Sequence, residues 1–169
     1  MKLTENFSLH EMTNSVTAQK RGINNMPTPE HIENLKALCE NVLEPVRALM
    51  GCPIKITSGY RSGQLNAYIG GAASSQHMFG QAVDIDLGPK NSELYDAIVK
   101  NLEFDQVIWE FGNDTNPEWV HVSYSSGKNR KKCLKAVKQN GKTSYLDITP
   151  TEKPKAEKPK AEKPKAKSK

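Results

Sequence analysis

The longest periodic pattern of hydrophobic residues lies between residues 28 and 49. Thr28-Pro29-Glu30 predicts a helix start there, with a capping hydroxyl, a proline at the first helical position and an acid that the helix dipole favours. Shorter helices are expected from the capping box Ser8–Glu11 and from Asn91 to about Leu102. The apolar positions of the long helix recur every three or four residues and form one face: Ile32, Leu35, Leu38, Cys39, Val42, Leu43, Val46 and Leu49.

Short apolar or alternating segments predict strands. In chain order they cover residues 53–58, 82–87, 106–109, 119–124 and, more weakly, 142–147. Because side chains alternate across a strand, Asp84 and Asp86 share one face of their segment. Trp119, His121 and Ser123 share one face of theirs. A strand that points two carboxylates the same way requires a cation or solvent on that side.

The positive charge of the chain is concentrated at its C-terminal end. Residues 151–169 hold eight of the 24 basic and three of the 19 acidic residues, which leaves 16 of each in residues 1–150. We expect residues 1–150 to form one neutral domain, without a specific nucleic-acid partner. A local basic cluster at residues 128–138 is interpreted as a solvated surface that follows the strand 119–124.

Residues 151–169 consist largely of a repeat of Glu-Lys-Pro-Lys-Ala. With regular prolines and no apolar side chain larger than alanine, this segment predicts a disordered tail. The tail either contacts anionic surfaces or serves as a solubilising spacer.

The N-terminus shows no secretory signal, and no apolar run is long enough to span a bilayer. We therefore expect synthesis in the cytoplasm without a signal peptide. A substrate outside the cell would then be reached by another route.

Two histidines stand where a loop and a strand would direct them into a common polar site. His77 ends the glycine-rich loop 70–77, and His121 shares this site with Asp84. Two imidazoles and one carboxylate leave one position of a tetrahedral zinc ion open, as in catalytic zinc sites. Asp86 is the alternative ligand, or a partner that orients a histidine.

Hydrolysis at such a centre also requires a carboxylate that carries a proton. Glu118, three residues before His121, is the first candidate for this base, and Glu110 is the alternative. Arg61, in the turn after the first strand, either balances charge on the carbonyl oxygen or holds the loop by hydrogen bonds. Two aromatic residues either line a substrate cleft or pack in the core: Tyr60 and Trp119.

Several motifs between Asn6 and Tyr124 occur in a recognisable order. They are Asn6-Phe7-Ser8-Leu9-His10-Glu11-Met12, Ser58-Gly59-Tyr60-Arg61-Ser62, Leu65-Asn66, Gly70-Gly71, Ser75-Gln76-His77, Gly80, Ala82, Asp84 and Trp119-Val120-His121-Val122-Ser123. Together they resemble the M15 family of zinc D-Ala-D-Ala carboxypeptidases and related phage endolysins.

The resemblance implies a compact α+β fold of the Hedgehog/DD-peptidase type, with a small antiparallel sheet packed by helices. It also implies one zinc ion on the two histidines and Asp84, with Arg61 stabilising the oxyanion. Ser75 is implied to contact the substrate, and Gln76 beside it is a further candidate for this contact.

The resulting hypothesis is a zinc metallopeptidase that cuts an amide bond in the peptide part of bacterial peptidoglycan. The resemblance permits a D-Ala-D-Ala carboxypeptidase, a D,D-endopeptidase or an endopeptidase between L-Ala and D-Glu. The expected partner is the stem peptide, met at the cell wall or periplasm after release through a membrane lesion or as a virion component. The alternative hypothesis is a non-catalytic zinc-containing wall-binding module with a basic anchoring tail.

Overall fold

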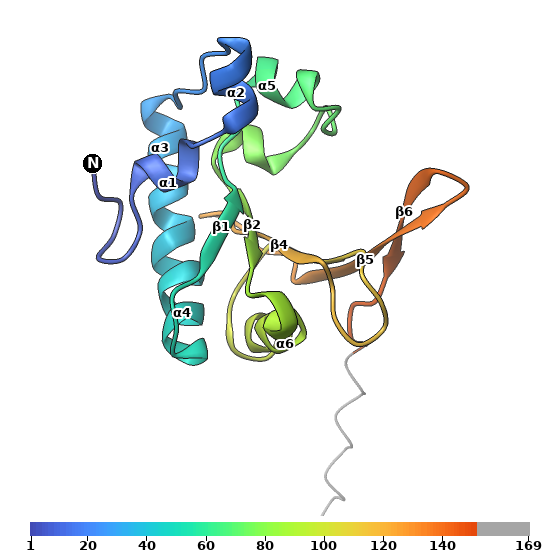
Figure 1. The fold of residues 1–169 in the computed structure, drawn as a ribbon. Coiled ribbons are helices and arrows are strands. Elements are labelled where there is room, and N and C mark those ends of the chain that lie inside the picture. The colour runs from blue at the N-terminus through green and yellow to red at the C-terminus, as the bar shows by residue number, and fades with distance from the viewer. Residues whose placement is uncertain (152–169) are drawn as a thin grey trace, which may run out of the picture.

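The strands of the molecule form one six-stranded sheet in a computed structural model that describes residues 1–151 (Figure 1). In spatial order they are β1 (Lys55–Ser58), β2 (Ala82–Asp86), β4 (Trp119–Ser123), β3 (Gln106–Glu110), β5 (Lys132–Gln139) and β6 (Lys142–Asp147). All neighbouring strands are antiparallel except β3 and β5, which are parallel. The strands expected from the sequence are present, and β5 is an addition to them.

The expected α+β fold is therefore confirmed, but the sheet is mixed rather than antiparallel throughout. Ser123 at the end of β4 pairs with Gln106 at the start of β3, and β2 occupies the other side of β4. The connection 124–131 carries the chain past the start of β3, so that β5 begins there and runs in the same direction. Part of the basic cluster interpreted as solvated surface is thus a sheet strand.

The helices precede the sheet in the chain or lie between its strands. They are α1 (Leu9–Thr13), α2 (Val16–Arg21), α3 (Pro29–Leu38), the π-helical turn η1 (Cys39–Leu43), α4 (Glu44–Met50), α5 (Gly63–Tyr68), the 3₁₀ turns η2 (Gln76–Phe79) and η3 (Gly88–Lys90), and α6 (Asn91–Asn101). None of the helices in residues 1–151 is long and apolar enough to cross a membrane. The predicted basic tail, apart from Thr151, lies outside the described residues.

The long helix expected after Thr28 is one continuous run of α3, η1 and α4. Thr28 caps it, because its side chain accepts a hydrogen bond from the backbone of His31. Pro45 has no N–H to donate to the carbonyl four residues earlier. The wider turn η1 ends at Leu43, just before this proline. The Glu44 N–H donates to the Cys39 carbonyl, five residues back. The helix continues past the proline without breaking.

The two faces of the sheet have different environments. Hydrophobic residues of the central strands are fully buried and join the helices in one core: Val83, Ile85, Val107, Val120 and Val122 from the sheet, with Leu35, Leu38, Cys39, Val42, Leu43, Val46, Leu94 and Ile98 from the helices. Residues between these strand positions face the other way. Asp84, His121 and Glu110 belong to that opposite face.

Glycine is required at position 59, where the chain leaves β1 and passes close to Met12 of α1. A Cβ atom placed there would lie 2.3 Å from the carbonyl oxygen of Met12, a backbone atom that accepts a hydrogen bond from Tyr60 N at 2.6 Å. We predict that Gly59→Ala destabilises the protein by about 1–3 kcal/mol, because the two segments must move apart. Urea unfolding monitored by circular dichroism measures the change.

Gly63→Ala is the matched control, because no atom lies within 4 Å of a Cβ placed at this first position of α5. Alanine favours helix, so its unfolding midpoint should equal or slightly exceed that of the wild type. Equal midpoints for the two variants would contradict the role assigned to Gly59.

Candidate metal centre

The three side chains predicted as metal ligands lie together at the face of the sheet opposite the hydrophobic core. His77 comes from η2, whereas Asp84 and His121 are directly paired residues of β2 and β4. One ligand atom of each lies within 4.8 Å of the others. All three residues are buried, with exposed fractions of 2%, 8% and 8% respectively. The strand pairing and the turn after α5 thus bring together residues far apart in the chain.

The distances within this triad fit a single zinc ion. Asp84 Oδ1 lies 3.4 Å from His77 Nε2 and 3.0 Å from His121 Nδ1. Ligand atoms about 2.0 Å from a tetrahedral zinc ion lie roughly 3.3 Å from one another. The group therefore has the donor types and the spacing to hold one zinc ion through three protein ligands.

His77 is held in the form that binds a metal through Nε2. Its Nδ1 lies 2.7 Å from the carbonyl oxygen of Gly59, which can only accept a hydrogen bond, so Nδ1 carries the proton. Burial lowers the pKa of His77 despite the opposing charge of Asp84. Burial therefore favours the neutral imidazole, whose Nε2 lone pair can bind a metal.

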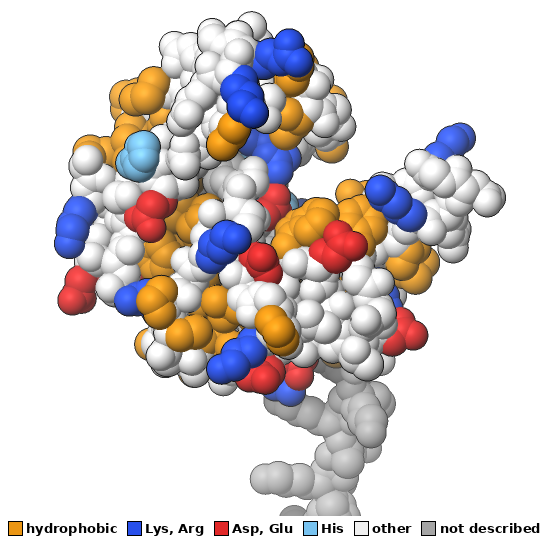
Figure 2. Space-filling view, viewed as in Figure 1, with side chains coloured by type: hydrophobic (Ala, Val, Ile, Leu, Met, Phe, Trp, Pro, Cys, Tyr) orange, Lys and Arg blue, Asp and Glu red, His pale blue; other side chains and the backbone are white. Residues whose placement is uncertain are grey.

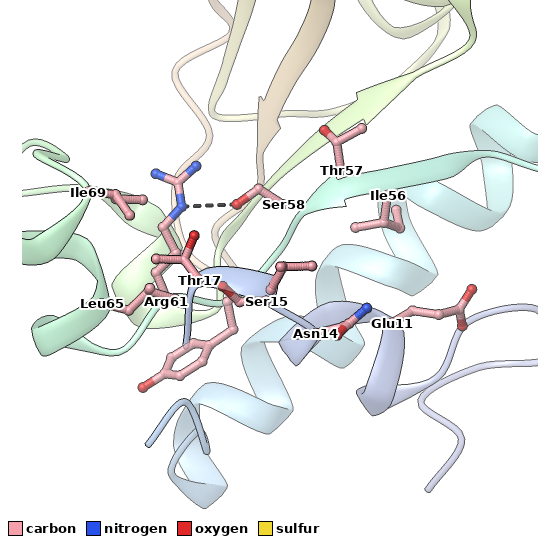
Figure 3. A pocket seen from close by; sticks show the side chains of 12 residues that line it. Glu11, Asn14, Ser15, Thr17, Ile56, Thr57, Ser58, Arg61, Leu65 and Ile69 are labelled. Carbon is pink, nitrogen blue, oxygen red and sulfur yellow. Dashed lines mark hydrogen bonds between the residues drawn. The ribbon is translucent and has the colours of Figure 1, made fainter. Parts of the chain in front are cut away.

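Arg61 holds the second oxygen of the Asp84 carboxylate. Its Nη2 donates to Asp84 Oδ2 at 2.9 Å. Its Nε donates to Ser58 Oγ at 3.0 Å, the bond drawn in Figure 3. Burial opposes the charged form of Asp84, but His77 and His121 outweigh it and hold the pKa of the carboxyl well below its usual range. Asp84 is therefore ionised, with Oδ1 directed at the imidazoles.

The triad opens into a cleft of about 880 Å³. Ser75, Gln76 and Trp119 line this cleft. Figure 2 shows a notch between the part of the surface formed by α2 and α5 and the projecting β5–β6 hairpin, with acidic and hydrophobic side chains at its base. Gln76 donates from Nε2 to Asp105 Oδ2 at 3.0 Å, which fixes one side of the opening.

Arg61 lies between this cleft and a smaller pocket, because it lines both. The smaller pocket has a volume of about 340 Å³ and is drawn in Figure 3. Tyr60 lines the smaller pocket and not the metal cleft. It is 6% exposed, and its ring lies 5.5 Å from that of His31. Of the two readings for Tyr60, the structure supports packing.

Glu110, the alternative base, lies in the metal cleft. It pairs with Trp119 across β3 and β4, so its side chain shares the face of His121. Glu110 is 8% exposed, and burial, the largest cause, raises its pKa to about 7 against the opposing charge of His121. A carboxylic acid with such a pKa both accepts and donates protons near neutral pH.

Glu118, the first candidate from the sequence, does not line this cleft. It is exposed, precedes β4 and borders a separate pocket with Lys135. Its closeness to His121 in sequence favoured it, but a residue three positions away along an extended chain lies on the opposite face. Its backbone N–H donates to the carbonyl of Glu110. The geometry thus supports Glu110 rather than Glu118 as the base.

Asp86, the alternative ligand, is not part of the triad. Its Oδ1 accepts hydrogen bonds from Gly88 N at 2.8 Å and from Asn91 Nδ2 at 2.9 Å. These bonds fix the turn into α6, which explains a carboxylate at this position without a metal.

Several cleft residues were not anticipated from the sequence. They are Ile69, Gln106, Ile108, Phe111, Arg130, Leu134 and Tyr145. The pairing of Ile108 with His121 could have been derived from strand alternation once β3 and β4 were aligned. Arg130 could not be predicted in this way. It forms a two-point ion pair with Asp105 through Nε and Nη2, and no short-range sequence pattern predicts that pair.

A sequence profile of the Peptidase M15 family matches residues 5–123, which include all three ligands, Arg61 and Glu110. The chain belongs to the peptidase M15 family. This M15 family member is also similar to the protein named zinc D-Ala-D-Ala carboxypeptidase from Streptomyces albus G, with 30% identity over 87 residues. The match covers 51% of this chain and 34% of that relative, so the chain matches about a third of the relative's length.

We predict that the protein binds one zinc ion and that Asp84→Asn weakens this binding by more than about 100-fold, because one charged ligand is lost. Zinc at 100 times its dissociation constant should stabilise the wild type by about 2.7 kcal/mol. Competition with a chromophoric chelator measures the affinity. Asp86→Asn is the matched control on the same strand face, and an equal loss there would refute the assignment of Asp84.

Glu110 should also make the metal-free protein less stable as the pH rises. Folding raises its pKa from the ordinary 4.5 to about 7. The contribution of Glu110 to the free energy of unfolding is therefore fully present below pH 4.5 and is lost as the pH rises through 7. Relative to Glu110→Gln, the wild type should lose about 3 kcal/mol over that range. Urea unfolding in chelator at several pH values tests this, with the exposed Glu118→Gln expected to follow the wild type. Parallel profiles for wild type and Glu110→Gln would contradict it.

Proposed function

We propose that this chain is a zinc peptidase that hydrolyses an amide bond in the peptide part of bacterial peptidoglycan. The observation that carries the proposal is a three-ligand group at the base of an open cleft, with the buried carboxyl group of Glu110 on the same sheet face. Membership of the peptidase M15 family supports the peptidase chemistry. The name of the Streptomyces relative supports zinc and a peptidoglycan substrate.

The metal triad, Glu110 and Arg61 have separate roles in the proposed reaction. A zinc ion in the triad would polarise the scissile carbonyl and lower the pKa of water. Glu110 removes the proton from the attacking water and returns it to the leaving amine, which its pKa of about 7 permits. Arg61 uses Nε and Nη2 for Ser58 and Asp84, which leaves Nη1 to donate to the carbonyl oxygen as negative charge develops.

The proposed substrate is a stem peptide of the cell wall. A cleft of about 880 Å³ lies in the size range of sites that enclose small ligands and short peptides. Cleavage is either at a D-Ala-D-Ala terminus, as the relative's name states for that protein, or within the peptide by endopeptidase action. We further propose that the enzyme meets this substrate at the cell wall, after release through a membrane lesion or as a virion component.

A catalytic role explains Glu110 better than a wall-binding role does. Binding alone requires no carboxyl group in the cleft whose burial opposes ionisation. Such a group destabilises the folded protein at neutral pH. The presence of this residue beside the triad therefore favours hydrolysis over the non-catalytic alternative.

Digestion of purified peptidoglycan, with fragments identified by mass spectrometry, tests the proposal. We predict that Glu110→Gln lowers kcat by about 10²- to 10⁴-fold while zinc affinity is retained, because the proton carrier is lost. Glu118→Gln is the matched control and should remain within about twofold of the wild type, as for a surface residue outside the cleft. Chelator should abolish cleavage, and zinc should restore it.

The opposite ranking of the two glutamate variants would reject the role of Glu110. Fragments that persist in chelator would reject the metal mechanism. Binding to the wall without fragments under any metal would favour the non-catalytic module.

A further inference from the structure

The β5–β6 hairpin lies outside the part of the chain that matches the M15 family, yet it contributes to the metal cleft. The match ends at Ser123, the last residue of β4. Leu134 of β5 and Tyr145 of β6 nevertheless line the cleft, together with Arg130. In Figures 1 and 2 the hairpin projects from the body and bounds the notch on one side. An element added to the matched region thus supplies a wall of the site.

Strand pairing places Tyr145 in line with Glu110. Trp119 pairs with Glu110, Glu110 with Ala136, and Ala136 with Tyr145, in one row across four strands. Directly paired residues project from the same face of a sheet. The face that carries the metal ligands therefore continues onto the hairpin.

One residue of β5, Ala136, lies between Glu110 and Tyr145 in this row, and its methyl side chain is fully buried. Because neighbouring strands are about 4.8 Å apart, the backbones of Glu110 and Tyr145 are roughly 10 Å apart. Both residues line the metal cleft. Tyr145 is 55% exposed, so much of its surface remains available to a ligand. Burial raises the pKa of Tyr145, and the charges of Glu110 and Asp84 add to this effect.

The position of Glu110 indicates which part of a substrate occupies the side of the cleft next to the hairpin. Glu110 returns the proton to the leaving amine, so the amine side of the scissile bond lies next to it. Asp84 and His121 lie on the other side of Glu110, on β2 and β4. A peptide that continues beyond the leaving nitrogen therefore runs past Leu134 of β5 towards Tyr145.

We propose that the β5–β6 hairpin is a specificity element and that the Tyr145 ring packs against stem-peptide residues on the amine side of the scissile bond. This inference rests on the proposed peptidase function. It implies a preference for substrates that continue past the cleaved bond. Aromatic side chains suit this role because a rigid ring offers a large contact area and a polar hydroxyl.

The test compares two synthetic stem peptides that are identical up to the scissile bond and carry either one residue or several residues after it. In the full-length zinc enzyme, Tyr145→Ala should raise KM for the longer peptide about tenfold, with kcat within about twofold. The shorter peptide should be affected much less. Tyr145→Phe, which keeps the ring, should stay close to the wild type.

Leu146→Ala is the matched control, because Leu146 is 47% exposed on the same strand and its side chain faces the opposite side. It should match the wild type for both peptides, and thermal midpoints establish that every variant is folded. Equal KM values for Tyr145→Ala and Leu146→Ala on the longer peptide overturn the hairpin proposal while the peptidase function stands.

Binding separates failure of the hairpin proposal from failure of the proposed function. Fluorescence anisotropy of labelled peptides is measured with Glu110→Gln alone and combined with Tyr145→Ala or Leu146→Ala. If the wild type cleaves neither peptide, a loss of affinity confined to the Tyr145 combination still supports the hairpin contact. Equal affinities of the two combinations overturn it. If the wild type does not cleave either peptide and Glu110→Gln does not bind either one, both proposals are overturned.

Discussion

The alternation of side chains along β2 and β4 is the constraint on which the site depends. Val83 and Ile85 are fully buried in the core, and Asp84 between them must face the other way. Val120 and Val122 fix His121 in the same manner. A slip of one residue in this pairing would turn the core side chains towards the cleft and the ligands into the core, so hydrophobic burial maintains the register. The energy that folds the sheet also positions two metal ligands.

His77 requires a different means of positioning, because it lies in a turn rather than a strand. Its hydrogen bond to the carbonyl of Gly59 ties this turn to the end of β1, and Arg61 N donates to the carbonyl of His77. The side chain of Arg61 in turn donates a hydrogen bond to Asp84. The ligand from the turn and the ligands from the sheet are therefore connected through one short segment after β1. Close contact between Gly59 and Met12 fixes that segment against α1.

Features set by neighbouring residues could be predicted from the sequence. The cap at Thr28, the face of the long helix and the sharing of a face by Asp84 and Asp86 follow from local periodicity. Glu110 could not be ranked above Glu118 in this way, because its position depends on which residue of β4 it pairs with. β5 was missed because Cys133, Leu134, Ala136 and Val137 occupy both faces among lysines, so the alternation of a strand is absent. The π-helical turn before Pro45 likewise depends on how the helix accommodates a missing donor.

The β5–β6 hairpin extends the sheet beyond β3, and this affects how the protein can diversify. The ligands and Glu110 lie within residues 5–123, whereas the outer wall of the cleft comes from a later hairpin. Insertions or exchanges in that hairpin change the reach and shape of the groove while the hydrogen-bonded β2–β4–β3 framework stays intact. Such an arrangement lets one reaction centre be adapted to walls of different chemical composition through changes in a single surface hairpin.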